Sequence, residues 1–233
     1  MIPNTPYTLL LFQVLAHLSI IPMILYATWW QWGISIFVYF LSGCFGMTMT
    51  YHRLLSHNAW KVNKSLKYLF TLFATIGLTG SAISWVSVHR QHHAYSDTNN
   101  DPHSPIYKGW FNAHYLSMFS TVKLKFAARL LKDKFFLFQH KFYFEINLVY
   151  AAILFMCSPF SVIYAWLVPA AILWNTGSSI VSLSHRNGTV HNDLPSALLV
   201  WGEGYHLNHH TNPSLWKFGK WDLGGFFIGL FKK

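Results

Sequence analysis

Two long apolar runs near the start of the chain constrain its fold more than any other feature of the sequence. A helix needs about 20 apolar residues to cross the hydrocarbon core of a bilayer. The run from Leu9 to Thr28 meets this requirement and ends in three tryptophans at 29, 30 and 32, which are typical of a membrane interface. After a short turn, Ile34 to Tyr51 predicts a second span that leads directly into His52.

A second pair of apolar runs follows in the last half of the chain. Residues 146–157 and 160–174 predict spans three and four, joined by a tight turn at Ser158 and Pro159. The fourth helix is expected to extend out of the bilayer toward His185. Charged residues make up only 10% of the chain, against roughly 25% in a soluble domain. The composition therefore agrees with a multi-pass membrane protein.

The apolar segment 66–88 is the exception among these runs. It links histidines at 52 and 57 to those at 89–93. If both groups bind the same metals, this segment cannot cross the membrane. We therefore expect it to be interfacial or re-entrant, with its irregular backbone packed against protein rather than lipid.

The positions of the basic residues predict the orientation in the membrane. None of the 17 Lys and Arg lies in residues 1–51 or in the turn at 158–159. Because short cytoplasmic segments carry the excess of basic residues, the histidine clusters and both termini are expected on the cytoplasmic side. A basic surface that only holds anionic lipid is the alternative interpretation. The predicted fold is one all-α integral membrane domain over residues 1–233, with four transmembrane helices, a cytoplasmic histidine-rich helical cap and interfacial or re-entrant helices.

The histidines carry the strongest functional signal. Eight of the 14 fall in three blocks: HRLLSH at 52–57, HRQHH at 89–93 and HLNHH at 206–210. In a helix, spacing i, i+3, i+4 projects three side chains from one face, with the last two about 100° apart, so one block can serve two metals. The last helical turn before His57 must loosen if 52 and 57 are to bind one ion. These blocks supply eight candidate ligands: His52, His57, His89, His92, His93, His206, His209 and His210.

His185 is the ninth candidate ligand, because span four is expected to carry it to the same side as the three blocks. The other five histidines lack a partner at helical spacing, so we expect them to serve in capping, hydrogen bonding or interfacial anchoring. These are His17, His103, His114, His140 and His191.

Residue types that are scarce or absent exclude two classes of metalloenzyme. The chain has only two glutamates, Glu145 and Glu203, which excludes the glutamate-rich four-helix di-iron scaffold. No HExxH zinc-protease motif occurs either. Neutral imidazoles suit Fe, Cu, Zn or Ni by ligand type. Two ions with about four nitrogens each, and open positions for a small molecule, are what the binding and reduction of oxygen would require.

The motifs resemble those of the membrane fatty acyl desaturases of the Δ9 type, known from bacteria, cyanobacteria and animals. The resemblance covers residues 34–230 and rests on HRLLSH, on WVSVHRQHHAYSDTNNDPHSP at 85–105 and on GEGYHLNHHTNP at 202–213. It implies an O2-dependent enzyme that introduces a cis double bond into a saturated acyl chain. It also implies that all nine histidines ligate two non-haem iron ions and that Trp85 lies near the acyl tunnel.

The resemblance also implies partners. These are an acyl-CoA or membrane glycerolipid as substrate, membrane lipids, and an external electron donor of the ferredoxin or cytochrome b5 type, since the chain contains no fused cytochrome b5-like domain. No nucleic acid is expected. Two positions depart from the family pattern: Val181 stands where an Asn usually holds a metal-bound water, and Thr79 stands where a Gln is common.

Other interpretations remain open at this point. A lipid hydroxylase or a carotenoid oxygenase could use similar histidine boxes, and a metal transporter or sensor could bind ions reversibly. Transport would favour ionisable groups within the spans, where only His17 lies deep. The basic and apolar stretch 121–141 predicts a helix in the membrane interface, or a docking surface for an acidic electron donor.

Overall fold

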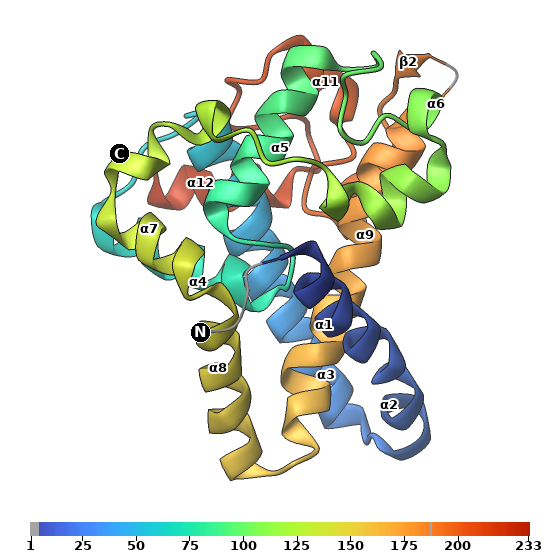
Figure 1. Ribbon diagram of the computed structural model, residues 1–233, viewed down its shortest axis with the longest axis vertical. Helices are drawn as coiled ribbons and strands as arrows, with labels where there is room; N and C mark the ends of the chain where they lie inside the picture. Colours follow the sequence, from blue (N-terminus) through green and yellow to red (C-terminus); the bar gives the residue numbers. More distant parts are fainter. Residues whose placement is uncertain (1–4, 187) are drawn as a thin grey trace.

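The computed structural model describes residues 5–186 and 188–233 and has two ends of different character (Figure 1). The apolar helices lie at one end, and most of the histidine-bearing segments and short helices lie at the other. The apolar helices are α1 (Pro6–Leu18), α2 (Ile20–Tyr26), α3 (Trp29–Phe40), α8 (Tyr143–Cys157), η6 (Ile163–Leu167) and the first part of α9 (Val168–Ser184). The predicted position of the N-terminus falls on residues 1–4, outside the described residues.

The first two predicted spans are present as long apolar helices. α1 and α2 together cover Pro6–Tyr26, and α3 continues into the π-helix η1 (Leu41–Ser56) to give a helix over Trp29–Ser56. Between them, the Oε1 atom of Gln31 accepts a hydrogen bond from the Thr28 backbone N–H at 2.8 Å and fixes the start of α3. The second helix is longer than expected, because helical winding continues past Tyr51 into the first histidine block.

The third and fourth predicted spans form the expected hairpin but differ in length. η6 and α9 form an apolar helix over Ile163–Ser184 that ends immediately before His185. α8 has only 15 residues, fewer than the roughly 20 that cross a bilayer, and follows directly on α7 (Lys134–Lys141). Among the described residues, three helices are therefore long and apolar enough to span a membrane.

The outer surface of the apolar helices carries large exposed hydrophobic side chains. Ile24 is 65% exposed, Leu25 64% and Met156 86%. Soluble monomers rarely expose contiguous apolar surface of this extent. The pattern fits a helical bundle whose outer face is covered by lipid, and it agrees with an all-α membrane protein.

The segment 66–88 reverses direction, as expected. α4 (Lys64–Ile76) and α5 (Ala82–Tyr95) form a hairpin whose tip lies against α1 and the start of α8. At the tip, the Leu78 carbonyl accepts a hydrogen bond from Gln13 Nε2 at 2.6 Å, and the Gly80 N–H donates to the Tyr143 hydroxyl at 3.0 Å. These bonds satisfy backbone groups that a turn inside an apolar bundle would otherwise leave unpaired. α5 therefore returns toward the histidines.

The remaining elements gather around α5 at the other end of the molecule (Figure 1). They are α6 (Pro105–Lys108), η2 (Asn112–Leu116), η3 (Ser117–Phe119), η4 (Leu124–Ala127), η5 (Leu130–Lys132), α10 (Leu194–Leu199), α11 (His206–Thr211) and α12 (Leu223–Phe231). One small departure from the all-α prediction is an antiparallel pair, β1 (His185–Arg186) and β2 (Thr189–Val190), with His185 opposite Val190.

The prediction of one interfacial helix over 121–141 is wrong. The stretch consists of two short 3₁₀ segments, η4 and η5, followed by α7. Side chains of α5 bind its backbone carbonyls: Ser87 Oγ donates to Lys123 at 2.8 Å, and Arg90 donates to Phe126 at 3.0 Å. Asp133 then starts a new helix by accepting a hydrogen bond from the Phe135 N–H. Tertiary contacts and this N-cap override the amphipathic pattern.

The main hydrophobic core lies between η1, α4, α5 and α12. η1 and α4 approach so closely that a Cβ added at Gly46 would overlap the backbone of Ala74. Only glycine permits this contact. The close packing holds the end of η1 rigidly beside α5, where the first two histidine blocks meet.

Candidate metal centre

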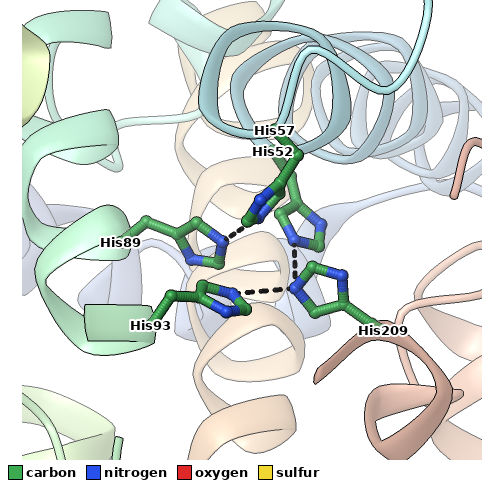
Figure 2. Close-up of side chains that lie close together, drawn as sticks. All are labelled: His52, His57, His89, His93 and His209. Atoms are coloured by element: carbon green, nitrogen blue, oxygen red, sulfur yellow. Dashed lines mark hydrogen bonds between the residues drawn. The ribbon is translucent and has the colours of Figure 1, made fainter. Parts of the chain in front are cut away.

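The structure brings all nine candidate histidines together in two adjacent clusters. The first cluster, which we term cluster A, contains His52, His57, His89, His93 and His209 (Figure 2). The second, cluster B, contains His92, His185, His206 and His210. Within each cluster, one nitrogen of every ring lies within 4.8 Å of those of the other rings. The nine residues predicted as ligands therefore lie together, while metal ligation itself stays a prediction.

Two short helices divide their histidines between the clusters. In α5, His89 and His93 face cluster A while His92 faces cluster B. In α11, His209 belongs to cluster A, whereas His206 and His210 belong to cluster B. This division follows from helical geometry, because neighbouring residues point about 100° apart and residues four apart share a face. Each of these helices thus contributes to both clusters.

The π-helical winding of η1 places His52 and His57 on the same side. The backbone N–H of His57 donates to the carbonyl of His52, five residues earlier, at 3.3 Å. This i→i+5 pattern widens the helix relative to the usual i→i+4 pattern, and such segments often occur at functional sites. The two ring centroids consequently lie 5.0 Å apart. The loosened last turn expected from the five-residue spacing is present.

The Nε2 atoms face one another inside the clusters. Nε2 of His52 and His209 lie 3.0 Å apart, those of His57 and His89 2.8 Å apart, and those of His185 and His206 2.9 Å apart. A neutral imidazole has one donor and one acceptor nitrogen, so this many converging acceptors cannot all be satisfied by each other. Converging imidazole nitrogens are the donor set of a transition-metal site. The residues therefore fit a pair of such ions.

Three carboxylates hold the opposite nitrogens of these rings. The Nδ1 atom of His52 lies 2.6 Å from Glu203, that of His92 2.9 Å from Asp101, and that of His185 2.9 Å from Asp97. A carboxylate behind a ligating histidine fixes its tautomer and makes the facing nitrogen a better ligand. Sequence reasoning did not assign these roles, although all three acids lie in the SDT, DPHSP and GEG segments that flank the boxes.

Glu203 is itself held by a buried arginine. Arg53 is fully buried and donates to Glu203 at 3.1 Å and to Asp222 at 2.8 Å. Its guanidinium also lies 3.9 Å from the ring centroid of Phe218. Burial alone would raise the pKa of Glu203, but attraction to His52 and Arg53 lowers it below its ordinary value. The network therefore keeps Glu203 ionised behind His52.

Burial keeps the clustered histidines neutral. It lowers the pKa of His93 to about 3 and that of His210 to about 2, with smaller contributions from neighbouring rings. The pKa values of His89, His92, His206 and His209 lie well below the ordinary value for the same reasons. A metal ion binds only deprotonated imidazole. The clusters are thus in the state that metal binding requires at neutral pH.

Four of the five remaining histidines make ordinary hydrogen bonds, as expected. His17 bonds to Gln13, His114 to Ser182, His140 to Ser81 and His191 to Thr189. His103 differs, because its ring lies 4.5 Å from that of His92 and borders cluster B. Its Nε2 is buried without a hydrogen-bond partner among the described residues.

An apolar cavity of about 230 Å³ lies directly beside the histidines. Trp85 lines it and stacks on His89, with ring centroids 4.8 Å apart. Val181 and Thr79, the two departures from the family pattern, also line it. The sequence prediction that Trp85 lies beside the space for a substrate agrees with this position, while binding itself stays a prediction.

A second, polar hollow lies on the other side of the segment 112–123. It is lined by Gln91, Asn99, Asn100 and Asn112 together with Lys108 and Lys123. Residues of the same segment, such as Ala113 and Met118, line the apolar cavity instead. The segment 112–123 therefore contributes side chains to both the polar hollow and the apolar cavity.

A protein-family model described as fatty acid desaturase matches residues 27–216, which contain every histidine of both clusters. The chain belongs to the fatty acid desaturase family. An acyl-CoA 5-desaturase of Anemone leveillei is 34% identical over 202 residues, which are 79% of this chain and 62% of the relative. An sn-2 palmitoyl-lipid 9-desaturase of Nostoc sp. (strain 36) is 32% identical over 212 residues, or 82% of this chain and 73% of the relative.

A further member of the desaturase family extends the range of named activities. The chloroplastic palmitoyl-monogalactosyldiacylglycerol delta-7 desaturase of Arabidopsis thaliana is 34% identical over 209 residues, which are 78% of this chain and 53% of the relative. The chain thus spans between about half and three quarters of the length of these desaturases. Their names include both CoA-linked and lipid-linked substrates and three positions of the double bond.

Proposed function

We propose that this chain is an acyl desaturase that introduces a cis double bond, at position 9, into a saturated acyl chain with O2 and a di-iron centre. The observation that carries the proposal is the position of the two histidine clusters at the wall of an apolar cavity. Cluster A contributes His52 and His89 to the lining, and cluster B contributes His206. An alkyl chain in this cavity would present its methylenes to both clusters.

The reaction has a simple balance. Two C–H bonds on adjacent methylenes are broken, one carbon–carbon double bond forms, and O2 with two electrons and two protons is reduced to two waters. Two bound iron ions, held by the nine histidines, would supply the oxidising power when O2 binds. The protein supplies position, since an unactivated alkyl chain offers no polar group near the reacting carbons. Trp85, rigidly stacked on His89, would fix the chain beside the centre.

The substrate's polar end would lie outside the apolar cavity. The hollow with Lys108 and Lys123 suits an anionic carrier, either acyl-CoA or a glycerolipid head group. The distance between this anchor and the metal centre would set the bond position, counted from the carboxyl carbon. Position 9 follows from the motif resemblance and from the name of the Nostoc relative.

We further propose four membrane-spanning helices, with α8 as the fourth. The histidine clusters and both termini would then lie on the cytoplasmic side; the absence of Lys and Arg from residues 1–51 and from the turn at 158–159 supports this orientation. An external donor of the ferredoxin or cytochrome b5 type would supply the electrons. The exposed basic side chains between 121 and 141 would suit an acidic partner or anionic lipid.

The test is fatty acid analysis of a host that lacks its own desaturase. We expect gas chromatography with mass spectrometry to show new monounsaturated chains when the chain is expressed with a ferredoxin or cytochrome b5 donor. The variant His92→Ala should abolish them, because it removes a ligand of cluster B. His191→Ala is the matched control, since His191 lies outside both clusters. Hydroxylated chains would instead favour the oxygenase interpretation, and unchanged lipids with both donors would contradict the proposal.

A further inference from the structure

One wall of the apolar cavity is formed by an indole ring that fills the gap between η1 and α9. Trp201 lines the cavity, is 5% exposed, and lies between η1 and α9. Its far edge rests on the backbone of Gly43, where an added Cβ would overlap the indole atoms Cη2 and Cζ3. Leu173 of α9 closes the same gap, since its Cδ1 would lie 3.2 Å from that Cβ. Trp201 and Leu173 therefore form the wall of the cavity above Gly43.

The space behind this ring lies between two long helices. Tyr39 is in contact with Trp201, with ring centroids 4.7 Å apart, and precedes Gly43 by four residues, further from His52 along the same helix. The Tyr39 hydroxyl bonds to Thr176 of α9 and to the carbonyl of Leu199, each at 3.0 Å. These bonds link α3 to α9 and α10 independently of Trp201. Loss of the indole would thus open the cavity toward Tyr39 without removing this link.

The backbone holds Trp201 in an unusual conformation. Its φ is +48°, in the left-handed region that bulky residues rarely adopt. Two hydrogen bonds maintain the conformation: the Trp201 carbonyl accepts from the Gly224 N–H at 3.0 Å, and the next residue, Gly202, donates to Ala197 at 2.7 Å. Non-glycine residues in this region persist where the surrounding structure enforces them, and they gather at functional sites. Here the effect is to aim the indole into the gap above Gly43.

We propose that Trp201, seated on Gly43, is the end stop of the acyl cavity and limits how far the methyl end of the substrate extends past the metal centre. The proposal rests on the proposed desaturase function and deepens it. The polar anchor determines where the double bond forms, whereas Trp201 determines the longest chain that fits. Chain length and bond position should therefore respond to different residues.

Two substitutions test the end stop, one that should lengthen the cavity and one that should shorten it. Trp201→Ala removes the ring and should raise the proportion of product two carbons longer than the wild-type product by about tenfold, since each added methylene becomes buried. Gly43→Ala should have the reverse effect, because the new Cβ overlaps ring atoms of Trp201 and not backbone, so the indole must shift toward the cavity. Its products should be shorter than those of the wild type.

The experiment feeds the expressing host a graded series of saturated fatty acids and measures both the length and the bond position of each product. Trp221→Ala is the matched control, because Trp221 is 55% exposed and does not line the cavity. Trp201→Phe, which keeps an aromatic ring of smaller size, serves if Trp201→Ala does not accumulate. Bond position, counted from the carboxyl carbon, should stay constant throughout.

The outcomes separate the two proposals. A wild-type chain that yields no unsaturated product overturns the desaturase function itself. A wild type that desaturates, with product lengths unchanged in both the Gly43 and the Trp201 variants, overturns the end stop alone. A shift in bond position without a change in length also overturns it, since that result would place Trp201 on the carboxyl side of the centre.

Discussion

Each clustered imidazole with a carboxylate partner uses its two nitrogens differently. In His52, His92 and His185 the Nε2 atom faces the other rings, while Nδ1 lies 2.6–2.9 Å from an acidic side chain. A carboxylate accepts a hydrogen bond from Nδ1, so the proton is held there and the Nε2 lone pair faces the cluster. The acids would thus influence a bound metal without contacting it.

The carboxylate behind His92 gives a direct prediction. Asp101 is fully buried and bonds Nδ1 of His92 through both oxygens. Replacing it by Asn should weaken iron binding about 10–100-fold, because the ring loses both its orientation and part of its basicity. Iron titration of the purified protein measures this loss. Asp133→Asn is the control, since Asp133 caps α7 away from the clusters; equal affinities in the two variants would contradict the role of Asp101.

At the residue scale, the sequence predicts which side chains lie together when their positions depend only on spacing along one helix. The i, i+3, i+4 pattern of α5 and α11 was sufficient to predict that each block serves two clusters. Asp97, Asp101 and Glu203 could not be assigned in this way, because their partners depend on how loops fold back over the helices. The same is true of Arg53, whose acidic partners lie 150 and 169 residues further along the chain.

At the scale of elements, the close contact between η1 and α4 positions the first histidine block. Gly46 lies in η1, six residues before His52, at the point where the backbone of Ala74 is nearest. Any side chain here must force the two helices apart. Because α4 leads through the hairpin tip into α5, a shift at Gly46 would change the distance between His57 and His89.

We therefore predict that Gly46→Ala lowers both stability and iron content. The overlapped atoms belong to a helix backbone, which cannot move aside as a side chain would, so the cost should reach about 1–3 kcal/mol. Gly33→Ala is the matched control in the same long helix, where the added Cβ meets nothing within 4 Å. That variant should be neutral or slightly stabilising. Thermal unfolding in detergent measures the stability of both variants, and metal analysis measures their iron content. Equal melting temperatures and equal iron contents would contradict the prediction.

Elements that depend on local sequence could be predicted, whereas elements that depend on tertiary contacts could not. Apolar length alone indicated the helices that begin at residues 6, 29 and 163, because lipid leaves the backbone few alternatives to a helix. The reversal of 66–88 followed from the positions of the histidines at its two ends. The stretch 121–141 failed, since its carbonyls bond to Ser87 and Arg90 rather than within one helix. The amphipathic pattern of a segment carries no information about hydrogen bonds to another helix.

At the scale of the whole molecule, the buried neutral histidines make stability depend on pH. The folded-state pKa of His93 is about 3 and that of His210 about 2, against an ordinary value of 6.5. Between these values the unfolded chain binds more protons than the folded chain. The free energy of unfolding must then fall as the pH decreases below 6.5.

We predict that the melting temperature of the metal-free protein is nearly constant above pH 6.5 and falls progressively below it. Differential scanning fluorimetry in detergent measures this profile. His93→Asn should flatten it, because one buried site no longer resists protonation. Added iron should raise the melting temperature most at neutral pH, since protons compete with metal for the same nitrogens. A profile that rises on acidification would show that other groups govern the stability.

The division of α11 between the two clusters has a consequence for how the protein assembles. Neither cluster is complete without residues 206–210, which are synthesised last among the histidine blocks and must reach His52, 157 residues earlier. Metal binding would therefore close a long loop between distant segments of the chain and would come late in assembly. A nascent or partly folded chain holds incomplete sites only. Metal-dependent chemistry at these clusters would thus wait until the cavity beside them has formed.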